Sequence, residues 1–118
     1  MEKFEFASLD RPFEADWPVV VQVPGDGGIV TPQTFMARLR LLSLEEIEAT
    51  LEAPDFSARS LPRQFFVGFG REEIFDGDFE AVRERLLEVA WTRDGLNGAY
   101  KQFAAGEASL GNSAPPAS

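Results

Sequence analysis

The sequence predicts an α+β fold in which a small antiparallel N-terminal β-meander of two to three strands packs against three to four α-helices. Two observations carry this prediction. Residues 17–42 alternate apolar and other side chains on both sides of a Pro-Gly loop, as the strands of a hairpin do. From residue 43 onwards apolar side chains recur every three or four positions, which is typical of amphipathic helices. In a chain of 118 residues we expect one domain over 1–105 and a disordered tail over 106–118.

At the front of the chain, two strands are expected before the hairpin turn. Residues 3–9 alternate phenylalanine with charged side chains and predict a short first strand, followed by a turn at 10–12. Residues 13–23 predict the second strand. Pro18 indicates that the regular part of this strand begins near Val19, because proline is confined to strand starts, bulges and edge strands.

The hairpin itself has one apolar face. Pro24–Gly28 forms its loop, because proline removes a backbone donor and glycine supplies positive φ. The apolar face comprises Trp17, Val19, Val21, Val23, Phe35, Ala37, Leu39 and Leu41. The other face of the second hairpin strand carries Thr34, Met36, Arg38 and Arg40.

The first helix begins at Ser43, because Ser43 and Glu46 have the spacing of a capping box. Acidic residues in its first turn suit the helix dipole, and Pro54 ends it. Its inward apolar stripe is expected to comprise Leu44, Ile47 and Leu51.

Residues 55–70 fit two alternatives. Ser60 followed by Leu-Pro resembles a helix start, which favours a short helix that ends at Gly68. Phe65–Val67 equally fits a short buried strand.

Two further helices follow a loop over residues 72–78 that turns at Asp76-Gly77. Asp78 caps the first of them, which extends to about Ala90, and Thr92 caps the second. The expected apolar faces are Phe79, Val82, Leu86 and Val89 in the first, and Leu96, Ala99, Tyr100 and Phe103 in the second. Gly95 and Gly98 weaken the second helix.

Composition excludes several function classes. The chain has no cysteine and no histidine, which removes disulfides, thiolate nucleophiles and the commonest general base. A net charge of -9 disfavours binding to nucleic acids and to anionic membranes. No apolar run is long enough to span a membrane, and the N-terminus lacks the pattern of a signal peptide. We therefore expect a cytoplasmic protein.

Two motifs suggest ligand sites and fail on their spacing. Gly68-Phe69-Gly70 begins like a dinucleotide-binding loop, but the third glycine is replaced by Glu73, which would repel a pyrophosphate. The acidic run over residues 72–80 lacks the register of a calcium-binding EF-hand. No carboxylate pair is marked as buried, so we expect no enzyme activity, no cofactor and no metal.

The candidate partner-binding residues are Met36, Arg38, Arg40 and Phe69. Arginine and methionine are enriched at protein interfaces, and three of these residues share one strand face in an otherwise acidic protein. This face is either a solvated surface, a contact surface for another chain, or the site where a partner strand is added at the sheet edge.

Four segments, taken in order, resemble the tail assembly chaperones of long-tailed phages and prophages. The segments are WPVVVQVPGDGG, TFMARLRLLS, FFVGFG and LNGAYKQFAAGEASLGNS. Members of that family have a valine-rich strand, a Pro-Gly loop, a Phe-x-Ala-x-Leu/Phe strand, a Val-Gly-Trp turn and a helix with Ala-Tyr before an Asn-terminated tail. The resemblance covers roughly residues 13–112. It departs at Phe69, where the family has tryptophan, and at 75–79, where a longer acidic loop is shortened.

The resemblance implies a non-catalytic protein that binds the tape measure protein during tail morphogenesis. It also implies a homo-oligomer, contact with the tail tube protein, and absence from the mature virion. The alternative is a structural tail component or head–tail joining component of a phage-like particle, because such subunits are also small and build on a β-sheet with a flanking helix.

Overall fold

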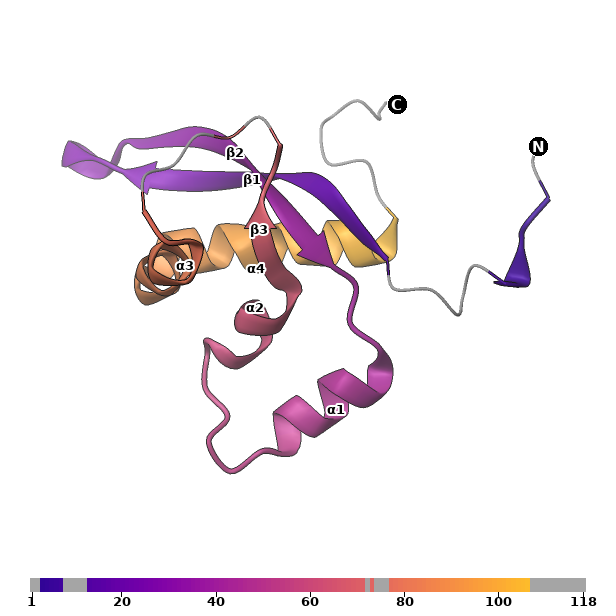
Figure 1. Ribbon diagram of the computed structural model, residues 1–118. Coiled ribbons are helices and arrows are strands. Elements are labelled where there is room, and N and C mark those ends of the chain that lie inside the picture. Colours follow the sequence, from indigo (N-terminus) through magenta and orange to yellow (C-terminus); the bar gives the residue numbers. More distant parts are fainter. Residues whose placement is uncertain (1–2, 8–12, 72, 74–76, 107–118) are drawn as a thin grey trace.

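The computed structural model describes residues 3–7, 13–71, 73 and 77–106. Its elements are β1 (Glu14–Pro24), η2 (Asp26–Gly28), β2 (Val30–Arg40), α1 (Leu44–Glu52), α2 (Ser60–Phe65), β3 (Phe66–Phe69), α3 (Phe79–Glu88) and α4 (Ala90–Ala105). The three strands form one antiparallel sheet in the order β1-β2-β3. Figure 1 shows α4 running beneath this sheet, with α2 and α1 below. The predicted α+β class is confirmed.

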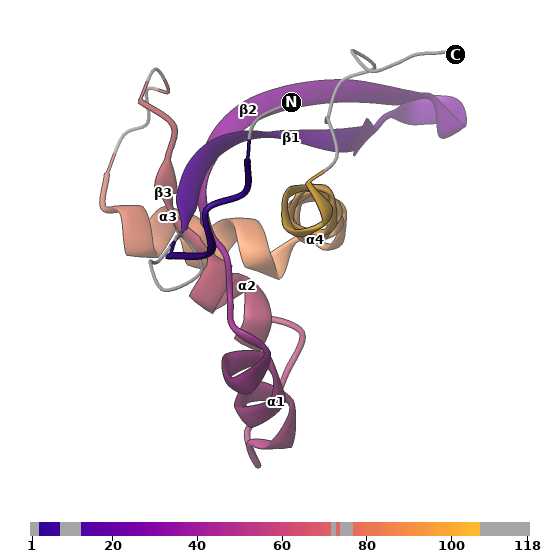
Figure 2. The same ribbon diagram turned by 90° about the vertical axis from the view of Figure 1, so that its right-hand side faces the viewer.

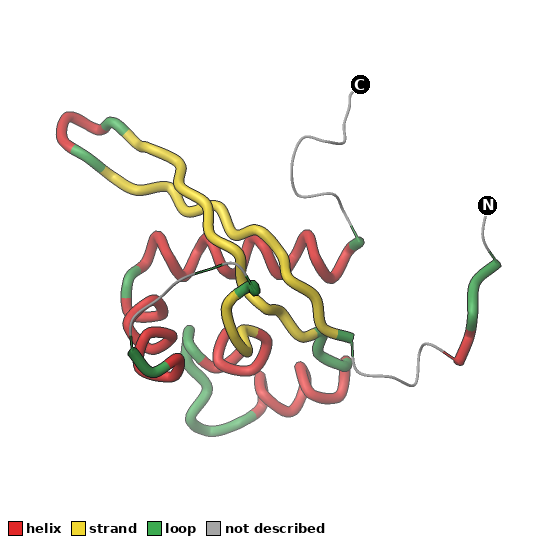
Figure 3. Tube along the Cα trace, turned by 45° about the horizontal axis from the view of Figure 1, so that its top comes forward, coloured by secondary structure: helices red, strands yellow, loops and turns green. Residues whose placement is uncertain are grey.

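The predicted hairpin is confirmed, including its two faces. β1 and β2 pair in unbroken register from Glu14 opposite Arg40 to Pro24 opposite Val30. The side chains of Val19, Ala37 and Leu39 on the apolar face are completely buried. Leu41, at the end of that face, is an exception and is exposed. Figure 3 shows the far end of the hairpin extending beyond the helices.

The third strand of the sheet is not the one predicted. Residues 3–7 contain no strand, so that part of the expected strand over 3–9 is wrong, and residues 8–12 lie outside the described part. Instead β3, far along the chain, pairs with β2 from Ala37 to Leu39. This pairing places the side chain of Phe66 beneath the sheet, where it is completely buried, and burial of apolar surface favours the pairing.

β1 begins at Glu14, ahead of the start predicted near Val19. Pro18, in the middle of the strand, is accommodated because β1 lies at the edge of the sheet. The N–H of Gly70 donates to the carbonyl of Met36 (2.8 Å), so the backbone polar groups of Met36 face β3. Its partner across the hairpin, Pro18, therefore turns its backbone nitrogen away from β2, where no ladder bond is lost.

Residues 60–69 combine the two predicted alternatives. α2 ends at Phe65 rather than at Gly68, and β3 begins with Phe66. Because the backbone changes from helix to strand between Phe65 and Phe66, the two neighbouring side chains point in different directions and both are buried. Phe65 stacks on Tyr100 with ring centroids 4.3 Å apart, and Phe66 packs against Phe79 at 5.1 Å.

α4 is the helix that covers the sheet. Its side chains Leu96, Ala99 and Phe103 are buried, as predicted. Gly95 is the point of closest approach: a Cβ at this position would lie 2.7 Å from the carbonyl oxygen of Val20 in β1. Any side chain there would push the helix off the strand.

The boundary between α3 and α4 differs from the prediction. Asp78 caps α3 as expected, its carboxylate accepting from the N–H of Ala81 (3.2 Å). α4 begins at Ala90, before Thr92, and the Thr92 hydroxyl does not cap it. The single proton of that hydroxyl is shared between the carbonyls of Val89 (2.9 Å) and Leu86 at the end of α3, which ties the start of α4 to α3.

α1 projects away from the sheet (Figure 2). The capping box of Ser43 and Glu46 is present, as predicted. The inward stripe is wrong for two of its members, since Leu44 is 70% and Leu51 is 50% exposed. α1 instead faces α2 with Thr50, which hydrogen-bonds to Gln64.

Two further predictions fall outside the described residues. They are the loop over residues 72–78 with its turn at Asp76-Gly77, of which residues 72 and 74–76 are not described, and the tail from residue 107 onwards. Gly106 closes α4 with a left-handed backbone, at φ 74°.

Candidate protein-binding surfaces

Three of the four predicted partner-binding residues share one surface. Met36, Arg38 and Arg40 lie on the outer face of β2, opposite the side chains that pack on α4. All three are half-buried rather than freely exposed. The outer face of the sheet is therefore a partly shielded polar surface.

The two arginines on this face are engaged within the chain. Arg38 Nη1 lies 3.1 Å from Asp16 Oδ1, and its Nε lies 3.4 Å from Glu14 Oε1 on the neighbouring strand. Arg40 Nη1 lies 3.0 Å from Glu46 Oε2 at the start of α1. A partner would have to compete for these guanidinium groups.

The carboxylates that hold the arginines are stabilised in their charged form. The N–H of Arg71 and the side chain of Arg38 lower the pKa of Asp16. The N–H of Ser43, and then Arg40, lower the pKa of Glu46. These groups stay ionised at neutral pH and fix β1, β2 and α1 to one another.

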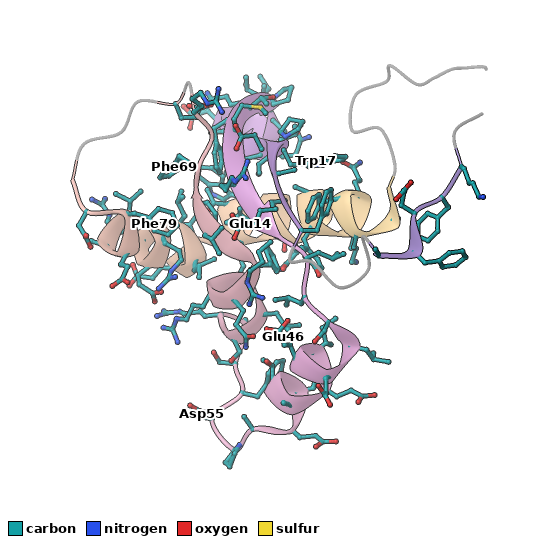
Figure 4. The ribbon with its side chains drawn as sticks, turned by 45° about the vertical axis from the view of Figure 1, so that its right-hand side comes forward. Glu14, Trp17, Glu46, Asp55, Phe69 and Phe79 are labelled. Carbon is teal, nitrogen blue, oxygen red and sulfur yellow. The ribbon has the colours of Figure 1, made fainter. Side chains whose placement is uncertain are left out.

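Phe69 lies on the other face of the sheet, so the four candidates do not form one surface. Its ring packs against Phe35 (5.8 Å between centroids), Phe66 (5.5 Å) and Phe79 (5.7 Å). Figure 4 labels Phe69 and Phe79 in this aromatic cluster. Phe69 therefore joins β3 to α3.

The sheet edges are poorly suited to the addition of a partner strand. Along β1, Pro18 and Pro24 occupy positions whose backbone nitrogen faces away from β2. Along β2 beyond β3, the carboxylate of Glu73 accepts the N–H of Met36 (2.6 Å), and Pro32 follows with no N–H to offer. Proline and charged caps of this kind block strand addition at exposed edges. This counts against one of the binding modes that the sequence left open.

An apolar pocket, which the sequence did not predict, lies between α1, α2, the loop that joins them, and α4. We name it the α1 pocket; its volume is about 390 Å³. It is lined by Leu42, Ile47, Phe56, Ser57, Ala58, Leu61, Pro62, Phe65, Asn97, Tyr100 and Lys101. The signal that could have found it is Phe56, an aromatic residue placed in the loop between two helices.

Polar contacts connect α1 to α4 on one side and to α2 on the other. The N–H of Leu42 donates to the hydroxyl of Tyr100 (3.0 Å), which anchors the start of α1 to α4. On the other side, the side chain of Gln64 in α2 donates to Thr50 in α1.

Neither a metal site nor a membrane helix is found within the described ranges. No group of three or more Asp, Glu, His or Cys residues there is placed to hold a metal ion. No helix over the same residues is both long and apolar enough to cross a membrane.

No family model matches this chain, and no match was found among curated proteins or among solved structures. The resemblance to tail assembly chaperones therefore depends on the order of the sequence segments alone.

Proposed function

We propose that this protein is a non-catalytic phage or prophage tail assembly chaperone that binds the tape measure protein during tail morphogenesis. The observation that carries the proposal is the order of the four matching segments. They correspond to β1 with its loop, to β2 and the cap of α1, to the end of α2 with β3, and to α4 and the residues after it. The resemblance thus falls on the sheet and on the helix that covers it.

The surface of the protein suits the binding of a long, aggregation-prone polypeptide. The α1 pocket and the exposed side chains beside it offer apolar contact area. The net charge of -9 would keep a complex of many copies soluble by mutual repulsion. Weak contacts repeated along one long partner add up through avidity. We further propose that the protein is cytoplasmic, forms homo-oligomers, contacts the tail tube protein and is absent from finished particles.

Co-expression tests the proposal. The protein is expressed together with a long helical tail protein, a phage tape measure protein, and the soluble fraction of that tail protein is measured with and without the co-expressed protein. We expect a marked rise in soluble protein and a complex that survives size-exclusion chromatography. An unchanged soluble fraction without a complex would show the proposal to be wrong.

The hairpin tip favours the second candidate, a structural tail or head–tail joining component. The tip extends past the helices (Figure 3) and carries Ile29 and Val30, which are 68% and 51% exposed. An apolar arm of this kind can insert between neighbouring subunits of a particle. Mass spectrometry of purified particles separates the two functions, because a structural subunit would be present in many copies and a chaperone would be absent.

A further inference from the structure

We propose that the α1 pocket, together with the apolar stripe of α1 (Leu44, Ile47 and Leu51), receives one amphipathic helix of a partner protein whose apolar positions are flanked by lysine or arginine. This inference deepens the proposed function and relies on it only for the identity of the partner.

The stripe and the pocket form one continuous apolar surface. Ile47 belongs to both, and Leu44 and Leu51 lie one turn before and one turn after it on the same face of α1. Leu44, Leu51 and Phe56 are 70%, 50% and 44% exposed, so they contribute little to the core. Large apolar side chains exposed beside an apolar hollow mark a surface that another molecule covers.

The dimensions suit a short helix. α1 has nine residues and is therefore roughly 13 Å long. A partner helix lying alongside it presents two to three turns, with apolar residues at positions i, i+3 or i+4, and i+7. One of these anchors can enter the pocket between Phe56 and Tyr100 while the others lie on the stripe.

A helix fits this surface better than an extended segment does. A helix satisfies its own backbone hydrogen bonds and can lie on an apolar wall without loss. An extended segment would leave backbone groups unpaired against the wall, and such groups need a sheet edge. The sheet edges are obstructed by Pro18, Pro32 and the carboxylate of Glu73.

The charges around the surface identify the chemistry of the partner. Three exposed carboxylates of α1 lie beside the stripe, and Lys101 is the one cation among the residues that line the pocket. The carboxylates are those of Glu45, Glu48 and Glu52. Lysine or arginine beside the apolar anchors of the partner complements them. A second copy of this chain would bring the same acidic rim against itself, which disfavours that occupant.

Three labelled peptides of about 18 residues test the proposal by fluorescence anisotropy. The first has a leucine stripe at helical spacing with lysine on both flanks; the second has the same stripe with glutamate flanks; the third scrambles the first so that the leucines lose their spacing. We expect the first peptide to bind the full-length protein at least about tenfold more tightly than the other two. Equal binding of the first and third peptides would overturn the proposal, because attraction by net charge alone would then explain it.

A double variant locates the site. Leu44→Gln with Leu51→Gln should weaken binding of the first peptide by about tenfold or more, because two apolar contacts are lost. The matched control, Ile29→Gln with Val30→Gln, removes two equally exposed apolar side chains from the hairpin tip and should leave binding unchanged. Circular dichroism checks that both double variants are folded. Unchanged binding by the α1 variant, or an equal loss in the control, contradicts the assignment of the site.

Co-expression with the tail protein separates this inference from the proposed function. If the chaperone solubilises that protein and the α1 double variant does so equally well, the inference is wrong and the function stands. If the peptide binds at α1 and the tail protein stays insoluble, the inference stands and the function is wrong.

Discussion

The contact between α4 and β1 gives a sharp prediction, because α4 contains two glycines in different surroundings. A Cβ at Gly95 would lie 2.7 Å from the carbonyl oxygen of Val20 and 2.7 Å from Cγ1 of Val21. A Cβ at Gly98 would meet nothing within 4 Å. Alanine at either position stabilises the helix by about 0.5–1 kcal/mol through its higher helix propensity. The two variants therefore share this gain in the free energy of unfolding and differ in the cost of packing the new methyl group.

Gly98→Ala is therefore expected to raise the free energy of unfolding by about 0.5–1 kcal/mol. Gly95→Ala gains the same amount but forces α4 away from a strand backbone, and overpacking of this kind costs about 1–3 kcal/mol. The two variants should differ by about that packing cost. In a domain of this size, 1 kcal/mol corresponds to roughly 4 °C in Tm, so Gly98→Ala melts above the parent protein and Gly95→Ala below it.

Urea unfolding followed by circular dichroism and by tryptophan fluorescence measures both variants. Trp17 is a suitable reporter, because its ring lies 5.5 Å from that of Phe103 in α4. The slope of the unfolding free energy against urea concentration should be unchanged in both variants, so that a shift in the midpoint of the unfolding transition reports a change in stability. If Gly95→Ala proves as stable as Gly98→Ala, α4 does not lie on β1 as described here.

Three other substitutions have defined outcomes. The carboxylate of Glu84 accepts from the guanidinium of Arg63 (2.7 Å), and this contact lowers the pKa of Glu84. The contact therefore stabilises the folded protein fully above the pKa of the unfolded state, and this stabilisation is lost as the pH falls through the pKa of the folded state. Glu84→Gln should therefore lower the free energy of unfolding by about 1 kcal/mol at pH 7 and by much less in acid, as measured by urea unfolding at the two pH values. Phe69→Ala should destabilise the protein by about 2–3 kcal/mol through loss of packing in the aromatic cluster, as measured by thermal unfolding. Arg38→Ala removes partly exposed ion pairs and should change stability by less than about 1 kcal/mol; a change as large as that of Phe69→Ala would contradict this description of the outer face.

Most of the fold could be predicted from local patterns in the sequence. The hairpin is specified by period-two alternation around Pro24–Gly28, and the capping residues Ser43 and Asp78 begin two helices where expected. These signals depend on residues close together in the chain, which is why the sequence alone is sufficient for them.

The third strand could not be predicted in the same way. β3 has four residues, and its partner in β2 lies about thirty residues away, so nothing in its own composition separates a strand from the end of a helix. The buried pairs Phe65 with Tyr100 and Phe66 with Phe79 determine the outcome. Such contacts depend on tertiary packing, which overrides local propensity.

The candidate site was predicted less completely than the fold. Met36, Arg38 and Arg40 share a face because alternation along one strand fixes it, but their carboxylate partners come from other elements. Phe69 belongs to the opposite face because β3 pairs with β2 in a register that the sequence does not reveal. The α1 pocket is formed by α1, the loop after it, α2 and α4, so no single local sequence pattern predicts it.

The way α1 is attached has a consequence for the dynamics of the molecule. None of the described core side chains belongs to α1, whose one buried side chain is Thr50. Loss of this helix would leave the packing between the sheet and α4 intact, so α1 can open locally at a free energy well below that of global unfolding. α1 can therefore detach and re-form while the sheet and α4 keep their arrangement.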